Sequence, residues 1–249
     1  MSKLWSSDDP SVWLAEYSSL DDKNSSLASV YKSRIQQLNK SNLLELNNWI
    51  NEELPSIVKS RSPFHILKNE LSQLMKWKLL HGQYRPRLQQ LVESNSETTI
   101  IDCTKRAYTI AQQTSNNQEQ YLSLVKSAIK ILCELHGVGP ATASAVLSII
   151  EPNQFPFMDD EAMNSIPKLK PIKYTIEHYL LFVQEIRKKV QILQKNSLDS
   201  DNKQFWTANR CVQCLWSEKH SQTVSKKVKR TNSSDDETTA RKKTRKSNI

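Results

Sequence analysis

The feature that most constrains this chain is its use of glycine, which occurs only three times in 249 residues. Two of the three, Gly137 and Gly139, stand between an apolar stretch with helical spacing and a second such stretch that begins at Pro140. Glycine tolerates positive φ and the close approach of another backbone, and proline suits the first turn of a helix. The sequence therefore predicts a helix, a tight glycine turn and a second helix. The unpaired N–H groups of such a turn make it a candidate phosphate site.

Apolar residues recur at intervals of three and four along most of the chain, and strand-like alternation is nearly absent. This spacing predicts helices that start at Pro10 or cover 41–58, 64–81, 119–135, 141–150 and 173–194. Polar composition predicts loops at 94–101 and 112–118, and two prolines make a continuous helix impossible over 151–160. The expected fold class is all-α.

The composition of the chain limits which other classes of protein it can belong to. The apolar fraction is 37% and the mean hydropathy is −0.61, which indicates that part of the chain is disordered. No apolar run is long enough for a membrane span. Cys103, Cys133, Cys211 and Cys214 are expected to be reduced thiols, and with His220 the last two make only a partial zinc set. We therefore expect no metal and no cofactor.

The net charge of +9 is concentrated at the C-terminus. Residues 221–249 hold nine Lys/Arg against three Asp/Glu, so the other 220 residues have a net charge of only +3. The basic residues form two clusters, Lys226, Lys227, Lys229 and Arg230, then Arg241, Lys242, Lys243, Arg245 and Lys246. Such clusters are typical of nuclear import signals, although a solvated basic tail with no targeting role has the same composition. We expect a helical domain over 1–220, a disordered basic tail over 221–249, contact with the nuclear import machinery and a nuclear location.

The residues around the glycine turn follow the pattern L-x-G-V-G-x-x-T-A, from Leu135 to Ala143. Over about residues 119–165 this chain resembles the helix-hairpin-helix DNA glycosylase superfamily. The resemblance implies a DNA-glycosylase-like helical fold with a hairpin over 119–150, in which Gly137, Val138 and Gly139 hold a DNA phosphate. The simpler alternative is an ordinary helix–helix turn that uses glycine at a C-cap.

An acidic segment follows the hairpin at 155–161, with the sequence FPFMDDE. In the superfamily an irregular segment at this place ends in an aspartate at the mouth of the active site. The layout is similar to a little-studied eukaryotic branch that reads P-F-x-x-D-E, which assigns that role to Asp160, with Asp159 as the alternative. A carboxylate there would stabilise positive charge on the sugar or polarise a water. Alternatively, the acidic residues only charge the first turn of the next helix.

One position departs from the pattern of the superfamily. Bifunctional members have a lysine two residues after the second glycine, where it attacks the sugar, and this chain has Ala141 there. If the protein is an enzyme, we therefore expect a monofunctional glycosylase without lyase activity by that route. The iron–sulfur branch needs four closely spaced cysteines, which this chain lacks.

The densest basic and aromatic stretch outside the tail covers residues 76–87. Arg85 and Arg87 lie just past a predicted helix end, where their guanidinium groups can reach phosphates. Tyr84 is a candidate for stacking on an extruded base, whereas the spacing of Trp77 from Leu74 predicts a core residue. The expected partner is duplex DNA, intact or damaged.

Three functions are compatible with the sequence. The first is a nuclear monofunctional base-excision repair glycosylase, and the second is a non-catalytic binder of DNA structure on the same fold. The third is a helical protein-interaction module whose hairpin only packs. The hairpin and the acidic segment favour the first two, while Ala141 favours the second over the first.

Overall fold

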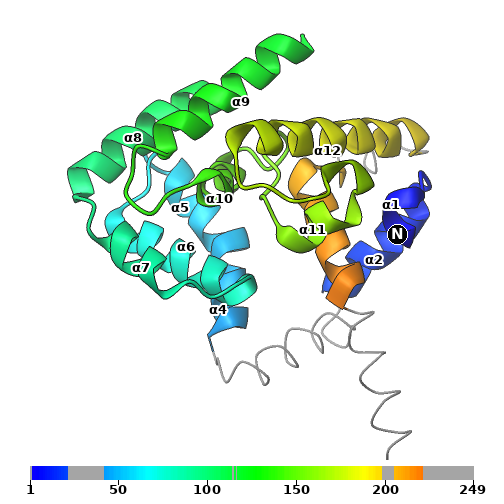
Figure 1. Ribbon diagram of the computed structural model, residues 1–249, viewed down its shortest axis with the longest axis horizontal. Coiled ribbons are helices and arrows are strands. Elements are labelled where there is room, and N and C mark those ends of the chain that lie inside the picture. The colour runs from blue at the N-terminus through cyan, green and yellow to red at the C-terminus, as the bar shows by residue number, and fades with distance from the viewer. Residues whose placement is uncertain (1, 22–41, 114, 116, 198–204, 221–249) are drawn as a thin grey trace, which may run out of the picture.

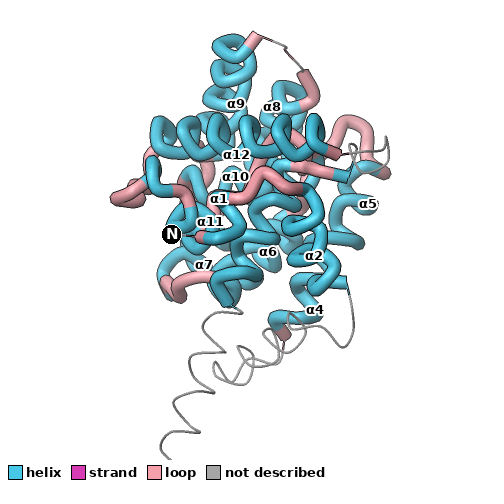
Figure 2. Tube along the Cα trace, turned by 90° about the vertical axis from the view of Figure 1, so that its right-hand side faces the viewer, coloured by secondary structure: helices cyan, strands magenta, loops and turns pink. Residues whose placement is uncertain are grey.

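The computed structural model describes residues 2–21, 42–113, 115, 117–197 and 205–220, and the regular structure within these ranges is all helical (Figure 1, Figure 2). The helices are α1 (Lys3–Ser6), α2 (Pro10–Asp21), α4 (Leu43–Asn48), the π-helical turn η1 (Trp49–Glu53), α5 (Leu54–Lys59), α6 (Lys68–His81), α7 (Pro86–Glu93), α8 (Glu97–Ala111), α9 (Gln118–Leu132), α10 (Pro140–Ile150), α11 (Asp160–Ser165), the 3-10 turn η2 (Pro167–Leu169) and α12 (Ile176–Asn196). A further helix covers 208–220. The all-α prediction is confirmed. The predicted tail, 221–249, lies outside the described residues.

Local signals placed several helix ends correctly. The start of α2 at Pro10 and the end of α6 before Gly82 match the predictions. Helix α6 begins at Lys68 rather than at 64, because Leu67 is extended and its N–H donates to the Glu70 carboxylate at 2.7 Å. Residues 151–159 are not helical, as their prolines predicted.

The predicted loop at 94–101 is wrong from Glu97 onward, where α8 begins. The Ser96 hydroxyl caps this helix and accepts the Thr99 N–H at 3.1 Å. The buried residues of α8 have helical spacing, namely Ile100, Cys103, Thr104, Ala107, Tyr108 and Ala111. The polar residues at its start are the exposed part of an amphipathic helix.

Helix α10 is the central element of the fold. Nearly all of its side chains are buried, and it contacts α5, α6, α8, α9 and α12. An apolar helix that is covered on all sides needs small residues where its neighbours come close, and Ala143 and Ala145 supply them. Because α10 starts at the glycine turn, its packing also fixes the position of that turn.

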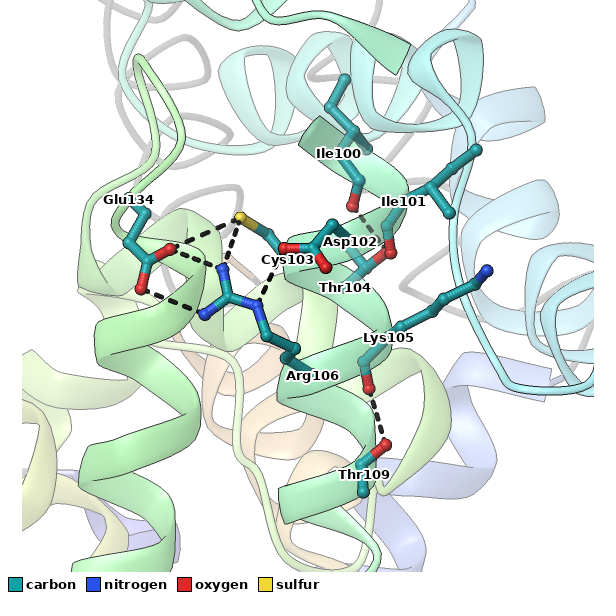
Figure 3. A network of polar contacts seen from close by, with 9 residues as sticks. All are labelled: Ile100, Ile101, Asp102, Cys103, Thr104, Lys105, Arg106, Thr109 and Glu134. Atoms are coloured by element: carbon teal, nitrogen blue, oxygen red, sulfur yellow. Dashed lines mark hydrogen bonds and ion pairs between the residues drawn. The ribbon is translucent and has the colours of Figure 1, made fainter. Parts of the chain in front are cut away.

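A polar network joins α8 to the residues that precede the glycine turn (Figure 3). The Arg106 guanidinium lies 2.6 Å from a Glu134 carboxylate oxygen and 2.9 Å from an Asp102 oxygen. The Cys103 Sγ lies 3.4 Å from the same guanidinium. Glu134 lies two residues after the last residue of α9, so the network ties the end of the first hairpin helix to α8.

The start of the chain packs against the helix at 208–220. The Glu218 carboxylate accepts the N–H groups of Lys3 and Leu4 at 2.9 and 3.0 Å. Trp13 is buried and packs edge-on against Trp206. One hydrophobic core accordingly extends from the first helices to the last one. Of the described helices, none has the length and apolar character needed to cross a membrane.

Candidate functional site

A cleft of about 180 Å³ lies where α6, the start of α7, the glycine turn and the start of α11 meet. Its polar and backbone lining is contributed by Lys78, His81, Arg85, Gly137, Gly139, Ala141, Asp159, Asp160, Glu161 and Tyr174. The structure therefore brings together the turn, the acidic segment and one predicted arginine, which are separated by up to 75 residues in the sequence. We call this place the hairpin cleft.

Gly137 is required by the fold. Its φ is +75°, and a Cβ there would lie 2.8 Å from the Leu91 Cβ and 3.0 Å from the Val92 N of α7. The backbone of α7 thus comes too close to Gly137 for any larger residue.

Gly139 differs from Gly137 in its backbone conformation and in the space around it. It is the extended N-cap of α10, and a Cβ built on it meets nothing within 4 Å. Its carbonyl accepts the N–H groups of Thr142 and Ala143, whereas the N–H groups of Gly139 and Ala141 have no acceptor among the described residues. These two donors lie at the N-terminus of α10, where partial positive charge accumulates.

Val138 belongs to the core rather than to the open part of the turn. Its side chain is buried, and its N–H donates to the Leu135 carbonyl at 3.2 Å. Of the three residues that the sequence predicted to hold a phosphate, only Gly137 and Gly139 line the hairpin cleft.

A buried asparagine holds the turn against α7. The Asn95 Oδ1 accepts the His136 N–H at 2.9 Å, and the Asn95 Nδ2 donates to the His136 carbonyl at 3.0 Å. Sequence reasoning missed this residue, because its partner is 41 positions away and no local pattern marks it.

Asp159 is buried and fully engaged. One carboxylate oxygen accepts the Ala162 N–H at 2.8 Å and caps α11, and the other lies 3.0 Å from the His81 Nε2. Only 2% of Asp159 is exposed, so little of its carboxylate can meet a ligand in this structure.

Asp160 is the first residue of α11 and is only partly buried. Its Oδ1 accepts the Tyr174 hydroxyl proton at 2.8 Å. Burial, followed by this hydrogen bond, raises the pKa of Tyr174 to about 12, so the phenol keeps its proton at neutral pH. A partly exposed carboxylate that a protonated phenol orients has acceptor capacity left for a sugar or a water.

His81 was missed as a partner of the acidic segment. Its ring is buried against Trp77 and Trp216, with centroids at 5.0 and 4.9 Å, and against Phe157 at 5.8 Å. The prediction that Trp77 is a core residue is confirmed. These aromatic rings hold His81 beside Asp159. The only sequence signal for the position of His81 was its spacing of four residues from Trp77 on α6.

The structure separates the predicted basic and aromatic residues. Arg85 is exposed, lines the hairpin cleft, and places its guanidinium carbon 5.2 Å from the centre of the Tyr174 ring. Arg87 and Tyr84 are also exposed but are not part of the cleft lining. Sequence reasoning did not single out Lys78, which enters the cleft from α6.

A second cleft, of about 390 Å³, lies on the other side of His81 and Phe157. Its lining includes Trp77, Trp216 and several amide side chains, but none of the residues that the sequence predicted to bind DNA. The predicted residues therefore select the hairpin cleft as the candidate site.

Within the described part of the chain, no group of three or more His, Cys, Asp or Glu side chains is placed to hold a metal ion. All four cysteines are free thiols. Comparison with protein-family models, curated proteins and solved structures gives no match for this chain.

Proposed function

We propose that this chain is a DNA-binding protein with a helix-hairpin-helix DNA-glycosylase-like fold, and that the hairpin cleft is its contact with DNA. One observation carries the proposal: a single cleft contains the unpaired N–H groups of Gly139 and Ala141, the Arg85 guanidinium and the Asp160 carboxylate. Helix N-termini and arginine forks are common ligands for phosphate oxygens. A carboxylate next to a bound phosphate is placed to act on the adjoining sugar.

DNA binding is tested by fluorescence anisotropy with labelled duplexes that are intact or contain one abasic-site analogue. Arg85→Ala should weaken binding about threefold to tenfold at low salt and reduce the salt slope by about one. Lys195→Ala is a matched control, because Lys195 is exposed at the far end of α12, about 30 Å along the helix axis from Ile176 at the start of that helix. Equal affinities of the wild type and Arg85→Ala for the duplex would show that the hairpin cleft does not contact DNA.

In the catalytic form of the proposal, Asp160 stabilises the sugar while water displaces the damaged base. Base release is measured on a panel of damaged duplexes, with alkaline cleavage to reveal abasic products. Asp160→Asn should abolish release and leave binding within twofold of the wild type. If Asp159→Asn alone abolishes release in a folded protein, the role belongs to Asp159. If the wild type releases no base from any duplex, the chain is a non-catalytic DNA binder.

The basic clusters of residues 226–230 and 241–246 carry the proposed nuclear location and the contact with the import machinery. A fluorescent fusion of the full chain should accumulate in nuclei, and a fusion that lacks residues 221–249 should not. A truncated fusion that accumulates equally well would remove the targeting role of the tail.

A further inference from the structure

The hairpin cleft contains a primary amine that the sequence pattern does not place there. Position 141, where a lysine would be expected in a lyase, is alanine, but the side chain of Lys78 enters the cleft from α6. Asp160 and the open Gly139 line the same cleft. A residue from a different helix thus supplies the functional group that the hairpin itself lacks.

The surroundings of Lys78 are unusual for a lysine. It is partly buried, and its amine makes no hydrogen bond or ion pair with any residue that the structure describes. A structural lysine in a comparable position normally pairs with a carboxylate, as Lys189 does with Asp8. Because no described residue engages the amine, it is available to a ligand in the cleft.

The same surroundings make the Lys78 amine easier to deprotonate than the amine of an exposed lysine. Burial, and then the neighbouring Arg85 cation, lower the pKa of Lys78, and the Asp160 carboxylate opposes the shift. Desolvation and a nearby cation are the two conditions under which lysines become nucleophiles toward carbonyl carbons.

We infer that Lys78 is an amine nucleophile for the aldehyde of an abasic deoxyribose, which gives the hairpin cleft a lyase activity. This inference rests on the proposed DNA binding. The alanine at position 141 argues only against a lyase reaction in which a lysine of the hairpin attacks the sugar. It does not argue against attack by a lysine from another helix.

The chemistry balances with the groups at hand. The neutral Lys78 Nζ adds to C1′ of the open-chain sugar, and the nitrogen proton passes to the former carbonyl oxygen. That oxygen takes a second proton from solvent and leaves as water, while the nitrogen lone pair forms the C=N bond of an iminium ion. A cleft carboxylate then removes a C2′ proton, and the C3′–O bond breaks with its electron pair on the departing 3′-phosphate. Hydrolysis of the iminium ion by water returns the free amine.

The experiment is borohydride trapping with the full chain and a duplex that contains one true abasic site. Hydride reduces the iminium carbon to a secondary amine, so the wild type should yield a covalent protein–DNA band. Lys78→Gln and Lys78→Arg should reduce that band about 50-fold or more, since neither side chain offers a nucleophilic amine. Lys76→Gln is the control, because Lys76 is exposed on the same helix and does not line the cleft.

Circular dichroism should show unchanged helicity for each variant, and anisotropy with the same duplex should show binding within about threefold of the wild type. A band that is equally strong in Lys78→Gln would overturn the inference, as would a wild type that binds the duplex without forming a band. A wild type that fails to bind the duplex at all would instead overturn the proposed function.

Discussion

The glycine turn and the acidic segment border the same cleft, and each contains two closely placed residues of the same type. In the turn, Gly137 has a positive φ and lies against α7, whereas Gly139 faces open space. In the acidic segment, Asp159 is buried as a helix cap and Asp160 is partly exposed. In both regions one member of the pair builds the fold and the other is open to a ligand. The atoms around each residue make this distinction, and the residue type does not.

The largest expected effect is on the fold, through Gly137→Ala. The substitution forces a side chain into a left-handed conformation and into contact with Leu91 and Val92. We expect the free energy of unfolding to fall by about 3 kcal/mol, since backbone strain adds to overpacking. Chemical denaturation measures it, and a loss smaller than about 1 kcal/mol would show that α7 yields easily and that the turn is not fixed as described.

The second effect compares the two aspartates. Asp159→Ala removes the cap of α11 and the carboxylate that pairs with buried His81, so we expect a loss of about 2 to 3 kcal/mol. Asp160→Ala removes only a partly exposed hydrogen bond and should cost about 0.5 kcal/mol. Thermal and urea unfolding of the two variants measure this difference. Equal losses would mean that the two carboxylates are not divided between fold and cleft.

A smaller effect is expected from Tyr174→Phe, which removes the donor that orients Asp160. Stability should change by no more than about 0.5 kcal/mol, since the phenol is half exposed. Base release, if the wild type has it, should fall severalfold while DNA affinity is retained. The same rate of release in this variant would show that Asp160 does not depend on the phenol.

Much of this arrangement could be predicted where local chemistry decides it. Gly82 ended α6, Pro140 opened α10, and the prolines of 151–160 interrupted the helices because each acts on its own backbone. Helix α8 was not predicted at all, because the polar residues at its start were given more weight than the helical spacing of Ile100, Cys103 and Ala107.

Other features depend on how distant segments pack. The His81–Asp159 pair joins residues 78 positions apart, and the place of Lys78 depends on the packing of α6 beside α11. The sequence marked both aspartates, but the neighbours that bury one of them come from elsewhere in the fold. The role of Asn95 in holding the turn is of the same kind.

The central claim is that the open part of the glycine turn holds the DNA backbone, and Gly139→Val tests it most directly. A Cβ at this position meets nothing within 4 Å in the protein, so the fold should tolerate the substitution, with a change in stability below about 1 kcal/mol. The side chain would project from the N-cap of α10 beside the unpaired N–H groups and keep a phosphate away from them. We predict that affinity for an abasic-site duplex falls at least about tenfold, with helical content and melting temperature unchanged. A folded Gly139→Val protein that binds the duplex as tightly as the wild type would contradict the account.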